Sequence, residues 1–409
     1  SLLTKEDDGL YHSAESTGYE GWIKLKDGLT DLVYARAIFN TALEALKIAK
    51  VNIKEAKIWQ EIVDNLAPLP ILVDQESIIA LNDNNYKLAR GFFKGKKIPT
   101  NNIFGAGYSI KDNRLLTVYE SVEDTLRHGF KLLDGIFPSV PSSPVFPSGL
   151  IGLSDKDNDL FDNMVATNLL YGTEITGWDP TSIVMARLGL ADALERDLTD
   201  FPGRWQIYDN GWGHWGLEHE VYGKDYHSIT KDAEMFFRTY EVEDINSNEV
   251  LPLRMWPFRH TSMESMSVMA TAMNESLLQS HEGILRVFPA FPDNRQGRFT
   301  LHAQGGFVVS SEIESGKVLW VSIKSLLGNK LKLQLPWGAA DMQRNNGGSI
   351  RQLKGEEVEL RTKVDEVITI VPKGASFENW KLNNEDPGPN DTVKYHSSGK
   401  TRLGIPRMF

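Results

Sequence analysis

The stretch Asn274-Glu275-Ser276-Leu277-Leu278-Gln279-Ser280-His281-Glu282-Gly283 lies where the hydrophobic pattern of the chain changes. Up to about residue 281 the apolar residues follow helical spacing, and after Glu282-Gly283 apolar and polar residues alternate. Helical spacing predicts a helix with one buried stripe, and strict alternation is typical of half-buried β-strands. The stripe of the helix at about 262–281 is expected to consist of Met263, Met266, Ala270, Met273 and Leu277. The sequence therefore predicts a helical domain over 1–283 and a β-domain after it.

The β-domain is predicted from short runs that are bounded by Gly, Asn and Asp, as in Gln304-Gly305-Gly306 and Asn345-Asn346-Gly347-Gly348. These β-like runs are 285–291, 298–303, 307–313, 318–323, 330–335 and 367–371. Several short strands with frequent turns favour an antiparallel β-sandwich, which we place at 284–373. The remaining segment, 374–409, is rich in Asn, Pro and Ser and is predicted to be an extended tail.

The helical domain shows the same logic upstream. One helix face is expected from Leu32, Ala35, Phe39, Ala42, Leu43 and Leu46. A second helix is expected to end before Pro68 and Pro70, because proline lacks the N–H that a helix interior needs. Further helices are predicted at about 118–134, 156–170 and 180–198. Four prolines within 137–149 predict a loop there.

Composition narrows the functional classes. Acidic residues outnumber basic ones by 55 to 44 among 409 residues, so we expect no nucleic-acid partner. There is no cysteine, which excludes disulfides and thiolate chemistry, and no apolar run approaches the roughly 18 residues of a membrane span. We find no phosphate loop and no spacing typical of metal ligands, so no metal and no cofactor are expected.

Two carboxylates are candidates for acid–base chemistry, Glu20 and Glu264. Both also fit a capping box, as Thr17-x-x-Glu20 and Thr261-x-x-Glu264, in which the glutamate would bond back to the threonine N–H. The two interpretations are compatible, because a helix N-terminus favours a negative side chain that must remain a base. Glu264 is expected to lie off the apolar face, on the side of Ser267 and Thr271.

Aromatic residues point to a sugar. Five of the ten tryptophans lie between 178 and 256: Trp178, Trp205, Trp212, Trp215 and Trp256. The segment 208–220 has neither helical nor strand periodicity, and its glycines favour a loop that displays Trp212, His214 and Trp215. Aromatic rings can stack on the C–H face of a sugar while neighbouring polar groups bind its hydroxyls. The alternative is that these rings fill the core between helices.

Several motifs together resemble the glycoside hydrolases of family 95, which are α-L-fucosidases and α-L-galactosidases. The resemblance rests on Leu277-Leu278-Gln279-Ser280-His281, on Phe288-Pro289-Ala290-Phe291-Pro292 and on Gly305-Gly306-Phe307. It also includes Gly177-Trp178 followed by Ala186-Arg187-Leu188-Gly189. It implies a partial (α/α)6-toroid-like helical domain followed by the β-sandwich, with an N-terminal part of the same protein missing. It further implies a secreted or periplasmic enzyme that acts on an oligosaccharide or polysaccharide.

The resemblance also implies an exo-acting, inverting hydrolysis that removes a terminal sugar. Glu264 falls where the family has the aspartate that helps polarise the attacking water, and Glu20 falls where it has the general acid. The residues expected to bind the sugar are Trp22, Trp178, Trp212, His214, Trp215 and His260.

Two alternatives remain open. A polysaccharide lyase on a helical toroid could use Tyr208, His214 or Tyr222. A carbohydrate-binding homologue without catalysis is favoured by two departures from the family: 138–152 contains no histidine, and Glu264 stands in place of an aspartate.

Overall fold

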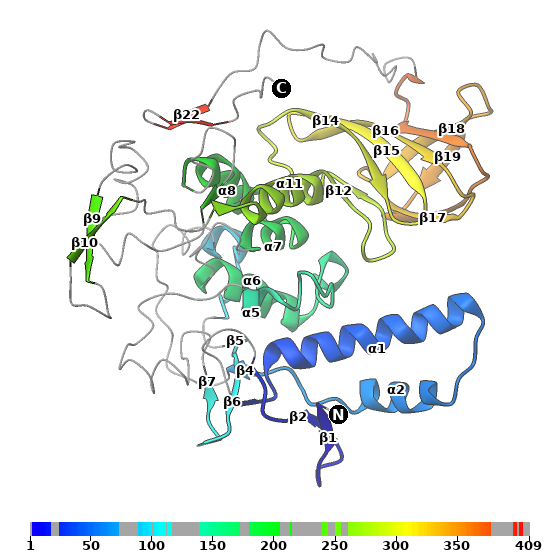
Figure 1. Ribbon diagram of the computed structural model, residues 1–409. Helices are drawn as coiled ribbons and strands as arrows, with labels where there is room; N and C mark the ends of the chain where they lie inside the picture. The colour runs from blue at the N-terminus through cyan, green and yellow to red at the C-terminus, as the bar shows by residue number, and fades with distance from the viewer. Residues whose placement is uncertain are drawn as a thin grey trace. The chain divides into compact units, whose positions relative to one another are not determined.

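The computed structural model describes residues 2–17, 24–72, 89–99, 102–111, 113–116, 139–171, 180–204, 213–214, 239–243, 250–254, 261–377, 396–398 and 401–403. The chain divides into two compact units, Ser1–Ile175 with Asp179–Val184, and Thr176–Trp178 with Met185–Phe409. The helices of the described residues all lie in the part of the chain up to α11, together with short strands. Among these residues, antiparallel strands follow α11 (Figure 1). The predicted order, a helical part followed by an antiparallel β-domain, is confirmed.

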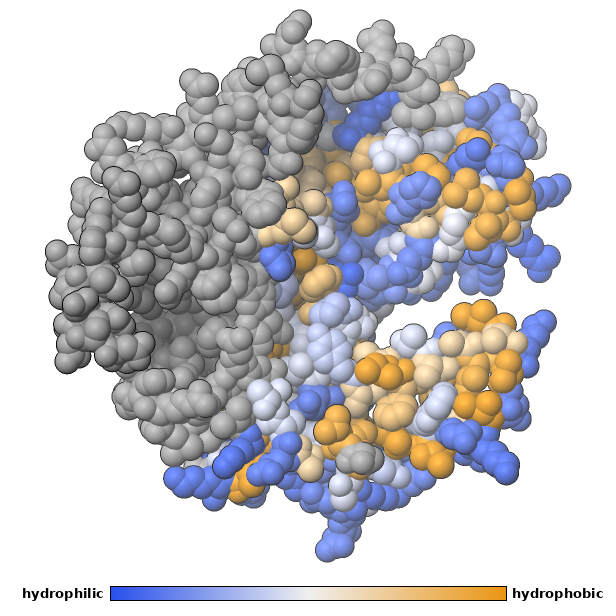
Figure 2. Space-filling model, viewed as in Figure 1, coloured by the Kyte–Doolittle hydropathy of each residue, from blue (hydrophilic) through white to orange (hydrophobic). Residues whose placement is uncertain are grey.

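Unit 1 begins with the β1–β2 hairpin, formed by Leu3–Lys5 and Tyr11–Ser13. Two helices follow, α1 (Leu29–Ala49) and α2 (Glu55–Asp64), and α2 ends before the prolines as predicted. The expected face of α1 is confirmed, because its predicted residues are all buried or half-buried. This helical hairpin also carries exposed apolar side chains, Ile38, Ile48, Val51 and Ile58, and Figure 2 shows hydrophobic surface over this part of the chain.

The described part of unit 1 also contains two small antiparallel sheets of short strands. Strand β3 (Leu25–Lys26) pairs with β6 (Gly107–Ser109), which pairs with β7 (Leu115–Leu116). Strand β4 (Ile71–Leu72) pairs with β5 (Ile103–Phe104). Gly107 has φ +146° and a Cβ there would lie 2.9 Å from the Cα of Gly28. Glycine is therefore required for β6 to approach the start of α1.

The loop predicted at 137–149 contains one helical turn, α5 (Ser139–Ser142). The expectation that the prolines leave only a loop is thus wrong for this turn. A proline near the start of a helix removes no hydrogen bond, because the N–H groups of a first turn have no intrahelical partner. A short 3-10 helix at Leu153–Asp155 leads to α6 (Asp159–Tyr171), which confirms the helix expected at 156–170.

The single helix predicted at 180–198 is two helices. Helix α7 (Thr181–Arg187) ends before Gly189, which adopts a left-handed conformation with φ 72°, and α8 (Ala191–Arg204) follows. A glycine in this conformation commonly terminates a helix, because it has no Cβ to clash. The helix predicted at 118–134 lies outside the described residues.

Unit 2 contains the helix that carries the key motif, α11 (Glu264–Leu277). It is shorter than predicted, since Leu278–Gln279 form strand β12, which pairs with β13 (Arg286–Val287). Its buried stripe also differs from the prediction. Val268, Ala272 and Ser276 are the buried residues at helical spacing, whereas Met263 and Met273 are 60% and 40% exposed. Small side chains on the inner face allow close approach of neighbouring elements such as α8, which α11 contacts.

Three small antiparallel pairs also belong to unit 2. Strands β8 (Gly213–His214) and β11 (Thr261–Ser262) pair, as do β9 (Thr239–Glu243) and β10 (Val250–Arg254). Near the C-terminus, β22 (His396–Ser398) pairs with β23 (Thr401–Leu403).

The β-domain is built on a six-stranded antiparallel sheet with the order β14-β15-β16-β21-β18-β19. These strands are Gly297–Ala303, Phe307–Glu314, Lys317–Ser325, Val367–Pro372, Ala339–Arg344 and Arg351–Lys354. A second sheet consists of β17 (Lys330–Gln334) and β20 (Glu357–Arg361). Residues of both sheets, such as Ile323 and Leu333, share one hydrophobic core, so the arrangement is a sandwich.

Candidate active site

Glu264 is the first residue of α11, and its side chain is exposed. It lies at the positive end of the helix dipole, where a negative side chain is favoured. Ser267 is also exposed and Thr271 is half-buried, so the polar side expected for Glu264 is present. The helix thus presents a carboxylate at its N-terminus, which is a suitable position for a group that must stay ionised to polarise water.

The capping-box interpretation of Glu264 is wrong. Thr261 belongs to strand β11, and the residue that caps α11 is Met263, which makes no side-chain capping bond. Because Glu264 is the first helical residue, it does not occupy the third helical position that a capping box requires. Its carboxylate is therefore not committed to that structural role.

One predicted sugar-binding residue is brought to the same place. The backbone of His214 in β8 pairs with Thr261 in β11, only a few residues before Glu264. Strand β8 also contacts α11. Two segments far apart in the sequence, one from the Trp- and Gly-rich region and one carrying Glu264, therefore meet within unit 2.

The other predicted site residues lie outside the described residues: Glu20, Trp22, Trp178, Trp212, Trp215 and His260. The same holds for Tyr208 and Tyr222 of the lyase alternative. Of the predicted site residues, Glu264 is described with its side chain and His214 with its backbone. The assignment of these residues as catalytic or sugar-binding stays a prediction.

The structure does describe the two ends of the segment that contains Glu20. Ser16 and Leu25 form an antiparallel bridge, with reciprocal backbone hydrogen bonds of 3.0 and 3.1 Å. The Ser16 hydroxyl also donates a short hydrogen bond to Asp31 in the first turn of α1. Burial raises the pKa of the Asp31 carboxyl, Ser16 counteracts this and nearby Asp27 adds to it. Glu20 thus belongs to a segment whose ends are fastened to each other and to α1.

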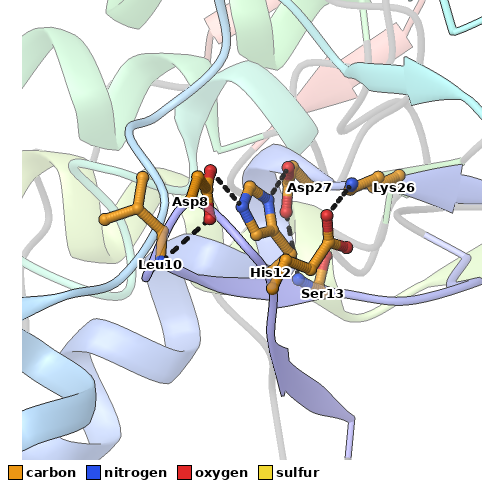
Figure 3. A network of polar contacts seen from close by, with 7 residues as sticks. Asp8, Leu10, His12, Ser13, Lys26 and Asp27 are labelled. Carbon is orange, nitrogen blue, oxygen red and sulfur yellow. Dashed lines mark hydrogen bonds and ion pairs between the residues drawn. The ribbon is translucent and has the colours of Figure 1, made fainter.

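A polar network supports the same region (Figure 3). His12 Nδ1 lies 2.7 Å from Asp27 Oδ2, and its Nε2 lies 3.0 Å from Asp8 Oδ2. The other oxygen of Asp27 accepts a hydrogen bond from the N–H of Ser13. Burial lowers the pKa of His12, but the hydrogen bonds to Asp27 and Asp8 outweigh it, so the pKa is raised above 6.5. His12 therefore links the β1–β2 hairpin to the segment that precedes α1 through its contacts with Asp27 and Asp8.

A second polar cluster lies at the other end of α11. Arg187 Nη2 donates to Glu275 Oε1 at 2.8 Å, and both side chains are largely buried. His281 Nδ1 lies 3.7 Å from Glu275 Oε2. Burial lowers the pKa of His281, and the charge of Arg187 lowers it further against the opposing effect of Glu275. Sequence reasoning used Arg187 and His281 as marks of a resemblance and did not predict that they meet.

No group of three or more His, Asp or Glu side chains suited to a metal ion occurs among the residues that the structure describes. Likewise, in the described part of the chain no helix combines the length and the apolarity needed to cross a membrane.

Comparison with known proteins identifies the β-domain. Residues 279–370 match the model of the glycoside hydrolase family 95 C-terminal domain. A solved structure, a putative kojibiose phosphorylase from human microbiome, is similar over 89% of this chain with 13% identity and a TM-score of 0.38. This chain spans 44% of the length of that structure. No curated protein matches the chain.

Proposed function

Because residues 279–370 match the model of the glycoside hydrolase family 95 C-terminal domain, we propose that this chain is a glycoside hydrolase that removes a terminal sugar from a glycan. The proposed sugar is α-L-fucose or an α-L-galactose-like residue. The proposed reaction is an exo-acting hydrolysis with inversion at the anomeric carbon. The family match is the observation that carries the proposal.

In this mechanism Glu264 is the ionised carboxylate that helps polarise the attacking water. Its exposed position as the first residue of α11 supports this role, because the helix dipole favours its charge. Glu264 also does not occupy the helix position that a capping box requires, because it is the first residue of α11.

Glu20 is the proposed general acid, which donates its proton to the departing glycosidic oxygen. Such an acid needs a raised pKa, which the neighbouring Tyr19 and Trp22 would provide by excluding water. Inversion also requires the two carboxyl groups to lie roughly 6.5–9.5 Å apart, so that a water fits between one of them and the sugar. The Ser16–Leu25 bridge holds together the two ends of the segment that carries Glu20.

The sugar would be held by aromatic rings and imidazoles. We assign this role to Trp22, Trp178, Trp212, His214, Trp215 and His260. The pairing of the His214 backbone with the strand that precedes Glu264 supports this assignment. We further propose that the substrate is an oligosaccharide or polysaccharide met outside the cytoplasm, in a secreted or periplasmic setting.

The test is hydrolysis of 4-nitrophenyl α-L-fucoside and the corresponding α-L-galactoside, with the anomer of the released sugar followed by proton NMR. Glu264→Gln and Glu20→Gln should each lower kcat by about 10²–10⁴-fold, as expected for loss of acid–base catalysis. Glu314→Gln is the matched control, because Glu314 is an exposed glutamate at the end of β15. Normal turnover in Glu264→Gln would refute its assigned role.

Two other outcomes identify the alternatives. A product that absorbs ultraviolet light because it contains a new double bond would identify a lyase. Glycan binding by the wild-type chain without any release of sugar would identify a binding homologue, which the glutamate in place of the family's aspartate favours.

A further inference from the structure

A cavity of about 300 Å³ lies within unit 2, beside the C-terminal end of α11. Helix α11 contributes Thr271, Asn274 and Glu275, which are spaced to lie on one helix face. The cavity is further lined by Arg187, Leu278, Ser280, His281, Leu301, His302 and Gln304. It is therefore an open pocket that is bounded by the end of α7, the end of α11, the 280–281 turn and the end of β14.

This cavity is separate from the proposed catalytic position. Glu264 and Glu275 occupy opposite ends of α11. Glu275 follows Glu264 by eleven positions, which correspond to about 16 Å along the helix axis at roughly 1.5 Å per residue. A ligand in the cavity would thus be remote from the Glu264 carboxylate, and the inference below does not depend on the proposed hydrolysis.

The charges at the cavity are balanced. Arg187 and Glu275 form an ion pair at 2.8 Å, so each neutralises the other. Burial and Arg187 lower the pKa of His281, which keeps its imidazole neutral at pH 7. A site for an anion or a cation would present an excess of the opposite charge, and these side chains present none.

Hydrogen-bonding capacity is nevertheless abundant. Among the described residues, neither ring nitrogen of His281 has a hydrogen-bond partner, although both are buried. A neutral imidazole offers one donor and one acceptor, and an alcohol hydroxyl is complementary to both. The amides of Asn274 and Gln304 lie at the rim, where both residues are exposed. Planar amides can bind adjacent hydroxyls through their paired donor and acceptor atoms.

We propose that this cavity binds one ring of a neutral sugar, as a second carbohydrate-binding site of the protein. Its volume is at the small end of the range for ligand sites, which suits a single monosaccharide unit. Leu278 and Leu301 supply apolar surface for the C–H groups of the ring, and the imidazole and amides bind its hydroxyls. The site would hold one sugar ring of a glycan while another sugar of the same glycan lies elsewhere on the protein.

The experiment is a titration of the whole chain with L-fucose, D-galactose, D-glucose and D-glucuronate, followed by saturation-transfer NMR. The test variant is Asn274→Ala/Gln304→Ala, which removes both rim amides. The matched control is Gln352→Ala, because Gln352 is exposed on β19 away from the cavity. Thermal unfolding midpoints equal to that of the wild type would establish that each variant is folded.

A neutral monosaccharide should bind wild type and Gln352→Ala equally and bind the double variant at least about tenfold more weakly, since two hydrogen-bonding groups are lost. The same binding should persist in Glu264→Gln, which separates this site from the proposed catalytic one. Equal affinity of wild type and double variant, absence of binding by every neutral sugar, or binding of D-glucuronate alone would each overturn the proposal. Loss of hydrolysis in Glu264→Gln with unchanged cavity binding leaves both proposals standing, and failure of one does not entail failure of the other.

Discussion

Gln279 Nε2 donates a hydrogen bond of 2.8 Å to the carbonyl oxygen of Ala186, which is 93 residues earlier in the chain. The same amide group donates to the carbonyl of Glu275 at 3.0 Å. Gln279 is only 1% exposed, so these bonds are made away from water. The amide therefore fastens the end of α11 to the end of α7, and it joins two of the motifs on which the family resemblance rests.

Replacing Gln279 by Met should destabilise unit 2. The substitution keeps a similar volume but removes both hydrogen bonds that the amide donates, at about 0.5–1.5 kcal/mol each, while the Ala186 carbonyl keeps the N–H of Gly189 at 3.1 Å. Urea unfolding followed by tryptophan fluorescence measures the effect. Gln352→Met is the matched control, since Gln352 is exposed. Equal midpoints for the two variants would show that the amide contributes nothing specific.

The Arg187–Glu275 ion pair should behave as a coupled unit. Each side chain is mostly buried, with exposed fractions of 11% and 16%. Removing one partner leaves an uncompensated charge and is expected to cost about 3–5 kcal/mol, whereas removing both costs less. A double-mutant cycle of Arg187→Met and Glu275→Gln, measured by chemical unfolding, gives the coupling. Additive effects would contradict it.

Stability of unit 1 should depend on the protonation of His12. Its pKa is raised above 6.5 in the folded chain, so its stabilising effect is complete below that pH and is lost as the pH rises through the folded pKa. The difference in thermal midpoint between wild type and His12→Gln should therefore shrink from about pH 6 to about pH 8.5. His302→Gln serves as the exposed control, and an equal decline in that variant would exclude a special role of Asp27 and Asp8.

Asp31 should reduce stability at neutral pH. Because burial raises its folded pKa above 3.8, folding disfavours the ionised form. This penalty is fully present above the folded pKa and disappears as the pH falls below 3.8. Asp31→Asn should accordingly raise the thermal midpoint at pH 7, with the gain diminishing toward about pH 4. A variant less stable than wild type at pH 7 would show that the Ser16 contact outweighs the burial.

Much of the fold follows from local patterns. The change from helical spacing to alternation predicts a helical part followed by an antiparallel β-domain, and this order is confirmed, because periodicity reflects which side of an element is buried. Strands β18, β19 and β20 were not predicted, since runs such as Arg351–Lys354 have one buried residue each and little apolar pattern. Asn345 and Asn346 were expected to mark a turn. They adopt φ of 50° and 54° in the connection between β18 and β19, a left-handed conformation in which asparagine is enriched.

The candidate site was less accessible to sequence reasoning. The position of Glu264 at the start of a helix is predictable from spacing. The capping box was not formed, because Thr261 lies in β11, which pairs with a strand far upstream. The inner face of α11 was misjudged because its buried stripe is made of small residues, Val268, Ala272 and Ser276, next to larger exposed methionines. The cavity at the other end of α11 depends on packing between distant segments, which no local pattern encodes.

The antiparallel bridge between Ser16 and Leu25 has a practical consequence. The bridge keeps the backbones of Ser16 and Leu25 within hydrogen-bonding distance of each other, at 3.0 and 3.1 Å. Side-chain substitutions between these two residues leave both backbone hydrogen bonds available, whereas a proline at position 16 or 25 would remove the N–H that donates one of them.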